Sequence, residues 1–120
     1  MEYIQQSIFD LTEFDDIKHL SKNGAEFWYA RELSKLLQYT EYNKFEKVIE
    51  KAKIACEESG NIIDDHFAHV SEMVKIGSSA SREFPSYMLS RYACYLIVQN
   101  ADARKKVVAQ GQSYFAIQTR

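Results

Sequence analysis

Apolar residues recur at helical spacing in two adjacent stretches of the chain. The first, "ARELSKLLQY" (residues 30–39), places its leucines on one face and its charged residues on the other. The second, "TEYNKFEKVIEKAKIACEESG" (residues 40–60), repeats apolar residues at the same period from Tyr42 to Cys56. Thr40 or Glu41 begins this second predicted helix, and Gly60 ends it.

The last third of the chain predicts two further helices. "RYACYLIVQN" (residues 91–100) follows Ser90, a favourable N-cap, and has so little polar surface that we expect a buried central helix. Asp102 is the predicted cap of the last helix. The residues expected to point inward from that helix are Val107, Val108, Gly111, Tyr114 and Phe115.

A hairpin is predicted between these two pairs of helices. Val74 and Ile76 alternate with other residues, the small-residue loop "GSSAS" follows, and an apolar-rich segment runs from Phe84 to Leu89. This order is typical of a β-hairpin and places one over residues 73–89. Pro85 has no backbone N–H to donate, so it requires an edge position.

Two assignments compete for the region that follows a flexible arm at residues 1–10. "LTEFDDIKH" (residues 11–19) has apolar residues at three-residue spacing, which favours a short helix before the Asn23-Gly24 turn and a short strand. Asn-Gly is also the strongest hairpin signal, so a strand "DIKHL" paired with "EFWYA" is the alternative.

These elements predict an α+β fold, a predominantly helical single domain of about five helices with a small β-hairpin component. A chain of 120 residues is long enough for one compact core and too short for two. The last helix reaches Arg120 without a stop signal, so we interpret residues 11–120 as one domain excised from a longer protein.

Composition indicates a cytoplasmic protein. No apolar run approaches the roughly 20 residues that cross a bilayer, and the N-terminus lacks the pattern of a secretory signal. Cys56 and Cys94 lie in apolar segments, and we interpret them as buried free thiols.

Acidic and imidazole side chains gather in "IIDDHFAHVSEM" (residues 62–73), and these are the materials of a metal site or an acid–base pair. On a helix, Asp65, His69 and Glu72 would share a face, with His66 near it. Their spacing differs from that of the helical zinc motif, so we favour acids that cap a helix over a metal-dependent hydrolase. No nucleophile or nucleotide motif occurs either, and we expect no enzyme activity, metal or cofactor.

Charge is unevenly distributed, although the net charge is only −2. Residues 54–72 contain five acids and no Lys or Arg, whereas residues 73–120 contain seven basic and two acidic residues. A polyanion can therefore meet the last third of the chain with little repulsion. "ARKK" is expected on the first turn of the last helix, where cations oppose the dipole. We expect phosphate contacts from Lys75, Arg82, Arg91, Arg104, Lys105 and Lys106. Arg31 and Lys35 are expected to form a second patch.

An aromatic segment supports a different class of function. Phe27, Trp28 and Tyr29 could form a surface that binds a repressor or a recombinase without contact to DNA. Weak salt dependence of binding, and its loss in Trp28→Ala, would favour this protein-interaction module over the nucleic-acid interface.

Four motifs occur in order between Phe14 and Arg120: "GAEFWYARELSKLLQYTEYNKF", "IDDHF", "LSRYACYLIVQNAD" and "GQSYFAIQTR". Together they resemble the N-terminal domain of the DNA-damage-inducible protein D family. The step from Trp28 through Ala30 and Arg31 to Leu33 is also similar to the N-terminal domain of BRO-type and phage antirepressor proteins, in which a strand leads into a helix.

The resemblance implies a small non-enzymatic α+β domain that regulates bacterial or phage DNA transactions. The implied partners are DNA, expected to be single-stranded, and the RecA-type recombinase filament on it, with a repressor as the antirepressor alternative. The implied location is the cytoplasm, at the nucleoid if DNA is bound. BRO-type relatives often carry Gly where this chain has Gln38, so we expect helical or ordinary turn geometry at that position.

Overall fold

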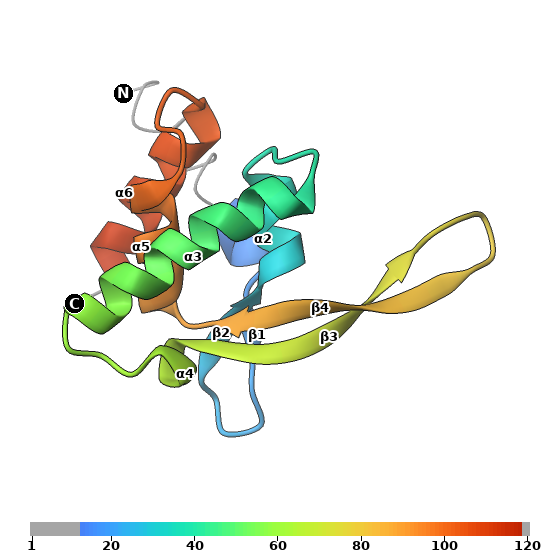
Figure 1. The fold of residues 1–120 in the computed structure, drawn as a ribbon, viewed down its shortest axis with the longest axis horizontal. Coiled ribbons are helices and arrows are strands. Elements are labelled where there is room, and N and C mark those ends of the chain that lie inside the picture. Colours follow the sequence, from blue (N-terminus) through green and yellow to red (C-terminus); the bar gives the residue numbers. More distant parts are fainter. Residues whose placement is uncertain (1–12, 119–120) are drawn as a thin grey trace.

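The computed structural model describes residues 13–118, and its strands form one antiparallel sheet beside a group of helices (Figure 1). The strand order is β1-β2-β4-β3. This architecture confirms the predicted α+β class. The elements are β1 (His19–Leu20), β2 (Glu26–Tyr29), α2 (Ala30–Leu36), α3 (Tyr42–Glu58), α4 (Ile63–His66), β3 (Phe67–Lys75), β4 (Ser81–Leu89), α5 (Arg91–Asn100) and α6 (Lys106–Gln118).

Both competing assignments for the N-terminal region are partly confirmed. Residues 13–16 are helical, and β1 then pairs antiparallel with β2 through His19 opposite Phe27. The turn between the two strands needs a left-handed residue, which Gly24 supplies with a φ of 84°. The predicted arm at residues 1–10 lies outside the described residues.

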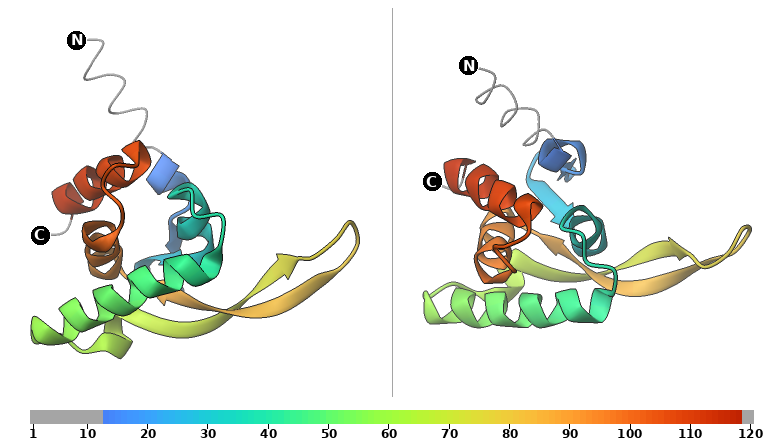
Figure 2. Two further views of the ribbon diagram at one scale, coloured as in Figure 1. Left: turned by 45° about the horizontal axis from the view of Figure 1, so that its top comes forward. Right: turned by 90° about the horizontal axis from the view of Figure 1, so that it is seen from above.

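β3 and β4 form a long two-stranded ribbon that extends away from the helices (Figures 1 and 2). Nine residue pairs join them, from Phe67 opposite Leu89 to Lys75 opposite Ser81. The hairpin is confirmed, but its strands are longer than the predicted residues 73–89, and the helical interpretation of residues 67–72 is wrong. Only α4 is helical in this region. Residues 67–72 show no sustained helical period, and their backbone groups pair with β4 instead.

Pro85 lies on an open side of β4, as the sequence required. β2 pairs with β4 only through Trp28–Leu89 and Tyr29–Met88, so no strand flanks the outer part of β4 on that side. The Pro85 carbonyl accepts a hydrogen bond from Arg31 Nε there (3.0 Å). Since the carbonyl faces this open side, the missing N–H of Pro85 removes no bond to β3.

The core lies where α5 meets α3 and α6. Both cysteines are free and buried, and Cys94 belongs to the fully buried face of α5. α5 and α6 approach closely at Gly111, where an added Cβ would lie 3.1 Å from both Phe14 and Val98. The predicted inward face of α6 is confirmed. The predicted cap needs correction, because α6 begins at Lys106 and Asp102 instead holds the preceding turn through the Arg104 N–H (3.0 Å).

Two helices end with the same left-handed motif. Gly60 after α3 has a φ of 84°, and Gln38 after α2 has a φ of 64°. In each case the next residue donates its N–H to a carbonyl five positions back, at 3.1 Å for Asn61 and 2.9 Å for Tyr39. The expectation of ordinary geometry at Gln38 is therefore wrong, since these bonds hold a non-glycine residue in the left-handed region.

Replacement of Gln38 by glycine should stabilise the domain. Gln38→Gly relieves the left-handed strain of a residue with a Cβ, and this relief exceeds the added chain entropy of the unfolded state. We expect the free energy of unfolding in urea to rise by up to about 1 kcal/mol. Lys47→Gly, at an exposed position within α3, is the control and should lower it by about 0.5–1 kcal/mol. A lower free energy of unfolding for Gln38→Gly than for the wild type would contradict the inferred backbone strain at Gln38.

Candidate functional site

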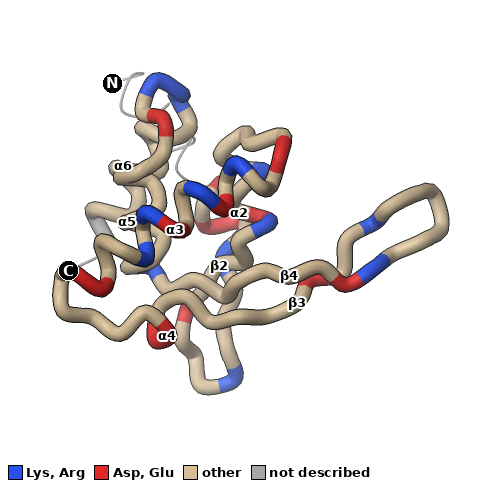
Figure 3. Tube along the Cα trace, viewed as in Figure 1, with Lys and Arg blue, Asp and Glu red and all other residues tan. Residues whose placement is uncertain are grey.

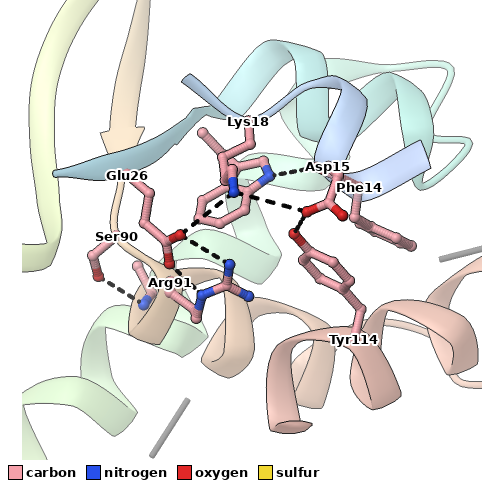
Figure 4. A network of polar contacts seen from close by, with 9 residues as sticks. Phe14, Asp15, Lys18, Glu26, Ser90, Arg91 and Tyr114 are labelled. Atoms are coloured by element: carbon pink, nitrogen blue, oxygen red, sulfur yellow. Dashed lines mark hydrogen bonds and ion pairs between the residues drawn. The ribbon is translucent and has the colours of Figure 1, made fainter. Parts of the chain in front are cut away.

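Arg91, one of the predicted phosphate contacts, lies inside a network that joins four segments of the fold (Figure 4). Its side chain is 12% exposed and forms two hydrogen bonds to the Glu26 carboxylate, of which the Nη2 bond measures 3.0 Å. Its guanidinium lies 4.9 Å from the Trp28 ring and 5.1 Å from the Tyr114 ring. The Arg91 side chain therefore has its partners within the domain, and the interface built below omits it.

Neighbouring groups extend the same network. Trp28 Nε1 donates to the Phe14 carbonyl (2.9 Å), and the Tyr114 hydroxyl donates to Asp15. Burial raises the pKa of Tyr114 to about 12, so this hydroxyl keeps its proton at neutral pH. Lys18 bridges Asp15 and Glu26 at 3.9 Å from each. These contacts hold the N-terminal helical segment against β2 and α6.

The predicted aromatic partner surface needs correction. Trp28 is fully buried, because its ring packs at 5.2 Å edge-to-face against Phe115 in the core. Phe27 and Tyr29 point to the other face of β2 and are half-buried in a cluster with His19. Trp28→Ala would cost about 3–5 kcal/mol of stability and so cannot serve as a test of partner binding.

The basic residues before α6 differ in their availability. Arg104 is exposed but forms an ion pair with Asp102 (3.0 Å). Lys105 lies 3.8 Å from the Tyr39 ring centroid and donates to the Gln38 carbonyl (3.2 Å). Only Lys106 belongs to α6, so the expected cluster of three cations on its first turn is wrong.

Lys35 lies between two hollows in the surface. One, of about 380 Å³, separates the end of α2 from the start of α6 and includes Lys106. The other, of about 440 Å³, separates α2 from β3 and includes Arg31 and Lys75. The fold thus brings together cations that the sequence placed in two separate patches.

Arg31 and Glu72 clamp the base of the ribbon to α2. Arg31 lies 3.9 Å from the Tyr42 ring and 5.3 Å from the Phe84 ring, in addition to its bond with Pro85. Glu72 accepts hydrogen bonds from the Arg31 backbone N–H (3.2 Å) and from the Ser86 hydroxyl. Since α2 has no side-chain cap of its own, Glu72 supplies one from another element.

Lys75 and Arg82 lie at the far end of the ribbon, where Figure 3 shows basic positions on both strands. Both are exposed, and neither has an acidic partner among residues 13–118. Lys75 pairs with Ser81 and Arg82 pairs with Val74. Adjacent pairs project to opposite faces, so the two cations lie one on each face of the ribbon.

The acidic and imidazole candidates do not form a site. Asp65 belongs to α4, whereas His69 and Glu72 are three residues apart on β3 and point to opposite faces. His69 instead packs on Tyr87 at 4.8 Å. No group of three possible metal ligands is arranged to hold an ion within the described part of the chain.

Sequence reasoning missed two features of the ribbon. The clamp between Glu72 and α2 joins residues 41 positions apart, and no local pattern signals it. The second is the exposure of two large apolar residues of the hairpin, Met73 and Ile76, which are 64% and 49% exposed. A large apolar residue directly after Lys75 and beside a loop of small residues was the available signal.

Comparisons with known proteins agree with the resemblance. A family model described as the BRO family, N-terminal domain, matches residues 16–116. The chain is 59% identical over 107 residues to the DNA damage-inducible protein D of Escherichia coli (strain K12), a match that covers 89% of this chain and 39% of that protein. The chain thus spans about two fifths of the length of this relative. No solved structure matches the chain significantly.

No helix in residues 13–118 is both long enough and apolar enough to span a bilayer.

Acid should weaken the Arg91 network through Glu26. The hydrogen bond from Arg91 lowers the pKa of the Glu26 carboxyl below its ordinary value. A carboxyl with a lower pKa in the folded state stabilises the fold above its unfolded pKa of about 4.3, and this contribution disappears as the pH falls through the folded value. We expect the free energy of unfolding to decrease below about pH 5, and to decrease less steeply in Glu26→Gln.

Urea titrations at pH 7, 5 and 4 measure this difference, with Glu46→Gln on the exposed face of α3 as the matched control. The control should follow the wild-type pH dependence. An identical pH dependence in Glu26→Gln and the wild type would contradict the assigned role of the ion pair.

Removal of the Glu72 carboxylate should loosen the ribbon. Glu72→Ala leaves the Arg31 N–H and the Ser86 hydroxyl without their acceptor, and we expect a loss of about 1–2 kcal/mol in unfolding free energy. Amide exchange near Ser86 should become faster. Glu83→Ala, at an exposed position on the same ribbon, should change neither quantity and is the control. Equal effects of the two variants would exclude a specific clamp.

Proposed function

Because the chain belongs to the BRO family and matches its N-terminal domain, we propose that it is a non-enzymatic regulatory domain of the DNA-damage response that contacts nucleic acid through the β3–β4 ribbon. The name of the E. coli relative connects that protein with DNA damage. The match covers only part of the relative, so any activity that belongs to the whole relative is carried over to this chain only as part of the proposal.

One observation carries the nucleic-acid contact: the ribbon extends from the body and ends in two cations without acidic partners among the described residues. A two-stranded ribbon fits the grooves of a duplex. With Lys75 on one face and Arg82 on the other, an inserted ribbon meets phosphates on both walls of a groove. Lys35 and Lys106 are exposed nearer the body and can contact the backbone farther along.

This geometry favours duplex DNA over the single strand expected from the resemblance. Proteins that bind single strands stack the bases on aromatic side chains. Among residues 13–116, none of the large exposed apolar residues is aromatic: they are Leu20, Ile54, Ile62, Met73 and Ile76. Single-stranded DNA and a recombinase filament on it therefore become alternative outcomes of the same experiment, in which both strand forms are titrated.

Fluorescence anisotropy of labelled oligonucleotides, single-stranded and duplex with the same sequence, tests the proposal at several salt concentrations. We expect duplex affinity to fall steeply with salt. The double variant Lys75→Gln/Arg82→Gln should reduce the slope of log K against log salt by about 0.9 for each lost phosphate contact. Lys47→Gln/Lys51→Gln makes the same charge change on the exposed face of α3 and should leave the slope unchanged.

Each other outcome has a defined meaning. A preference for single-stranded DNA, with the same reduction of the salt slope in the double variant, would support the ribbon contact and show that the bound form is the single strand expected from the resemblance. No binding of either strand at low salt would reject direct nucleic-acid contact. Work would then turn to a protein partner such as a repressor or a recombinase.

A further inference from the structure

We propose that the turn of the β3–β4 ribbon carries an apolar wedge, Ile76, which inserts between base pairs from the minor groove and bends the duplex. This inference rests on the proposed function and adds how the ribbon tip engages DNA.

The turn contains one large apolar residue among small ones. Ile76 N–H bonds to the Ala80 carbonyl (3.1 Å) and closes a loop made otherwise of glycine, serine and alanine. Ile76 is 49% exposed. Its neighbours in the loop are small, so Ile76 is the large apolar side chain that the turn presents.

Ile76 lies near two cations that have no acidic partner among residues 13–118. Lys75 directly precedes Ile76 in sequence, and Arg82 faces Val74 across the ribbon. Nucleic acid is the polymer that offers a charged exterior together with an apolar stack of bases. An apolar side chain with adjacent cations is complementary to that arrangement, whereas an apolar protein surface would leave both cations without a counter-charge.

Insertion between base steps points to the minor groove. Proteins that enter this groove commonly insert Ile, Leu, Met, Phe or Pro between base steps and kink the duplex. Lys75 and Arg82, on opposite faces, are then placed toward the two flanking phosphate strands.

A wedge can bend DNA only if its support resists the reaction force. The ribbon base is held by the Arg31–Pro85 hydrogen bond (3.0 Å) and by the Glu72 contacts to α2 and Ser86. Lys53 of α3 adds a 2.7 Å bond to the Tyr87 hydroxyl. These bonds attach both strands of the ribbon to the helices of the body.

Bending can be measured with the whole chain and a duplex of about 30 base pairs that has a donor and an acceptor dye at its ends and a flexible TA step in the middle. We expect wild-type protein to increase energy transfer. Ile76→Ala should abolish most of that increase and weaken binding about tenfold or more, with an unchanged salt slope. Ile54→Ala, at a residue that is 61% exposed on α3, is the matched control and should behave as wild type.

The outcomes separate the wedge from the proposed function. Binding with a steep salt slope but no change in energy transfer, or equal bending by Ile76→Ala, would overturn the wedge and leave the phosphate contacts intact. Absence of salt-dependent binding by the wild type would overturn both. Loss of bending only in Lys75→Gln/Arg82→Gln would assign the bend to charge neutralisation and also overturn the wedge.

Discussion

The fold depends on one partly buried cation. Arg91, at the start of α5, pairs with Glu26 of β2 and lies against the rings of Trp28, Tyr114 and Phe115. An arginine in such a place needs a paired carboxylate, because a desolvated charge without a partner costs far more than the pair contributes. The pair therefore determines which part of β2 can face α5.

The consequences reach the ribbon through the chain itself. Ser90 caps α5 by accepting a hydrogen bond from the Ala93 N–H (3.0 Å), and it directly follows Leu89, which pairs with Trp28. The Trp28 ring therefore contacts the Arg91 guanidinium, and the Trp28 backbone pairs with Leu89. These contacts fix the end of β4 nearest the body and so determine the direction in which the ribbon extends. The hydrogen bond between Glu72 and the Arg31 N–H fixes the ribbon a second time, farther from the body.

Helices were the predictable part of this fold. α2, α3 and α5 each carry apolar residues at a helical period over their length, and the period itself identifies the buried face. Residues 67–72 were mistaken for helix because acids and histidines three and four positions apart imitate that period. Their true partner strand lies after the turn, and pairing with it cannot be deduced from residues 62–73 alone.

The site was predictable only in part, for a related reason. Lys75 and Arg82 were identified from local charge, and the fold leaves both exposed. Arg91 looked the same in sequence, but its partner Glu26 is 65 positions away and holds its side chain in a partly buried contact within the domain. Trp28 was mistaken for surface because a three-residue aromatic run does not reveal which member points inward. In each of these cases a long-range contact determined the role.

This arrangement separates the residues that maintain the fold from those free to contact a partner. The Arg91 network and the Trp28 ring lie at one end of β4, and the exposed cations lie at the other. A substitution at the ribbon turn removes no buried contact, whereas one at Arg91 or Trp28 opens the core. Loss of binding in a core variant would therefore report unfolding rather than contact with the partner. Only the ribbon end and the exposed lysines of the body offer variants in which binding changes while the fold stays intact.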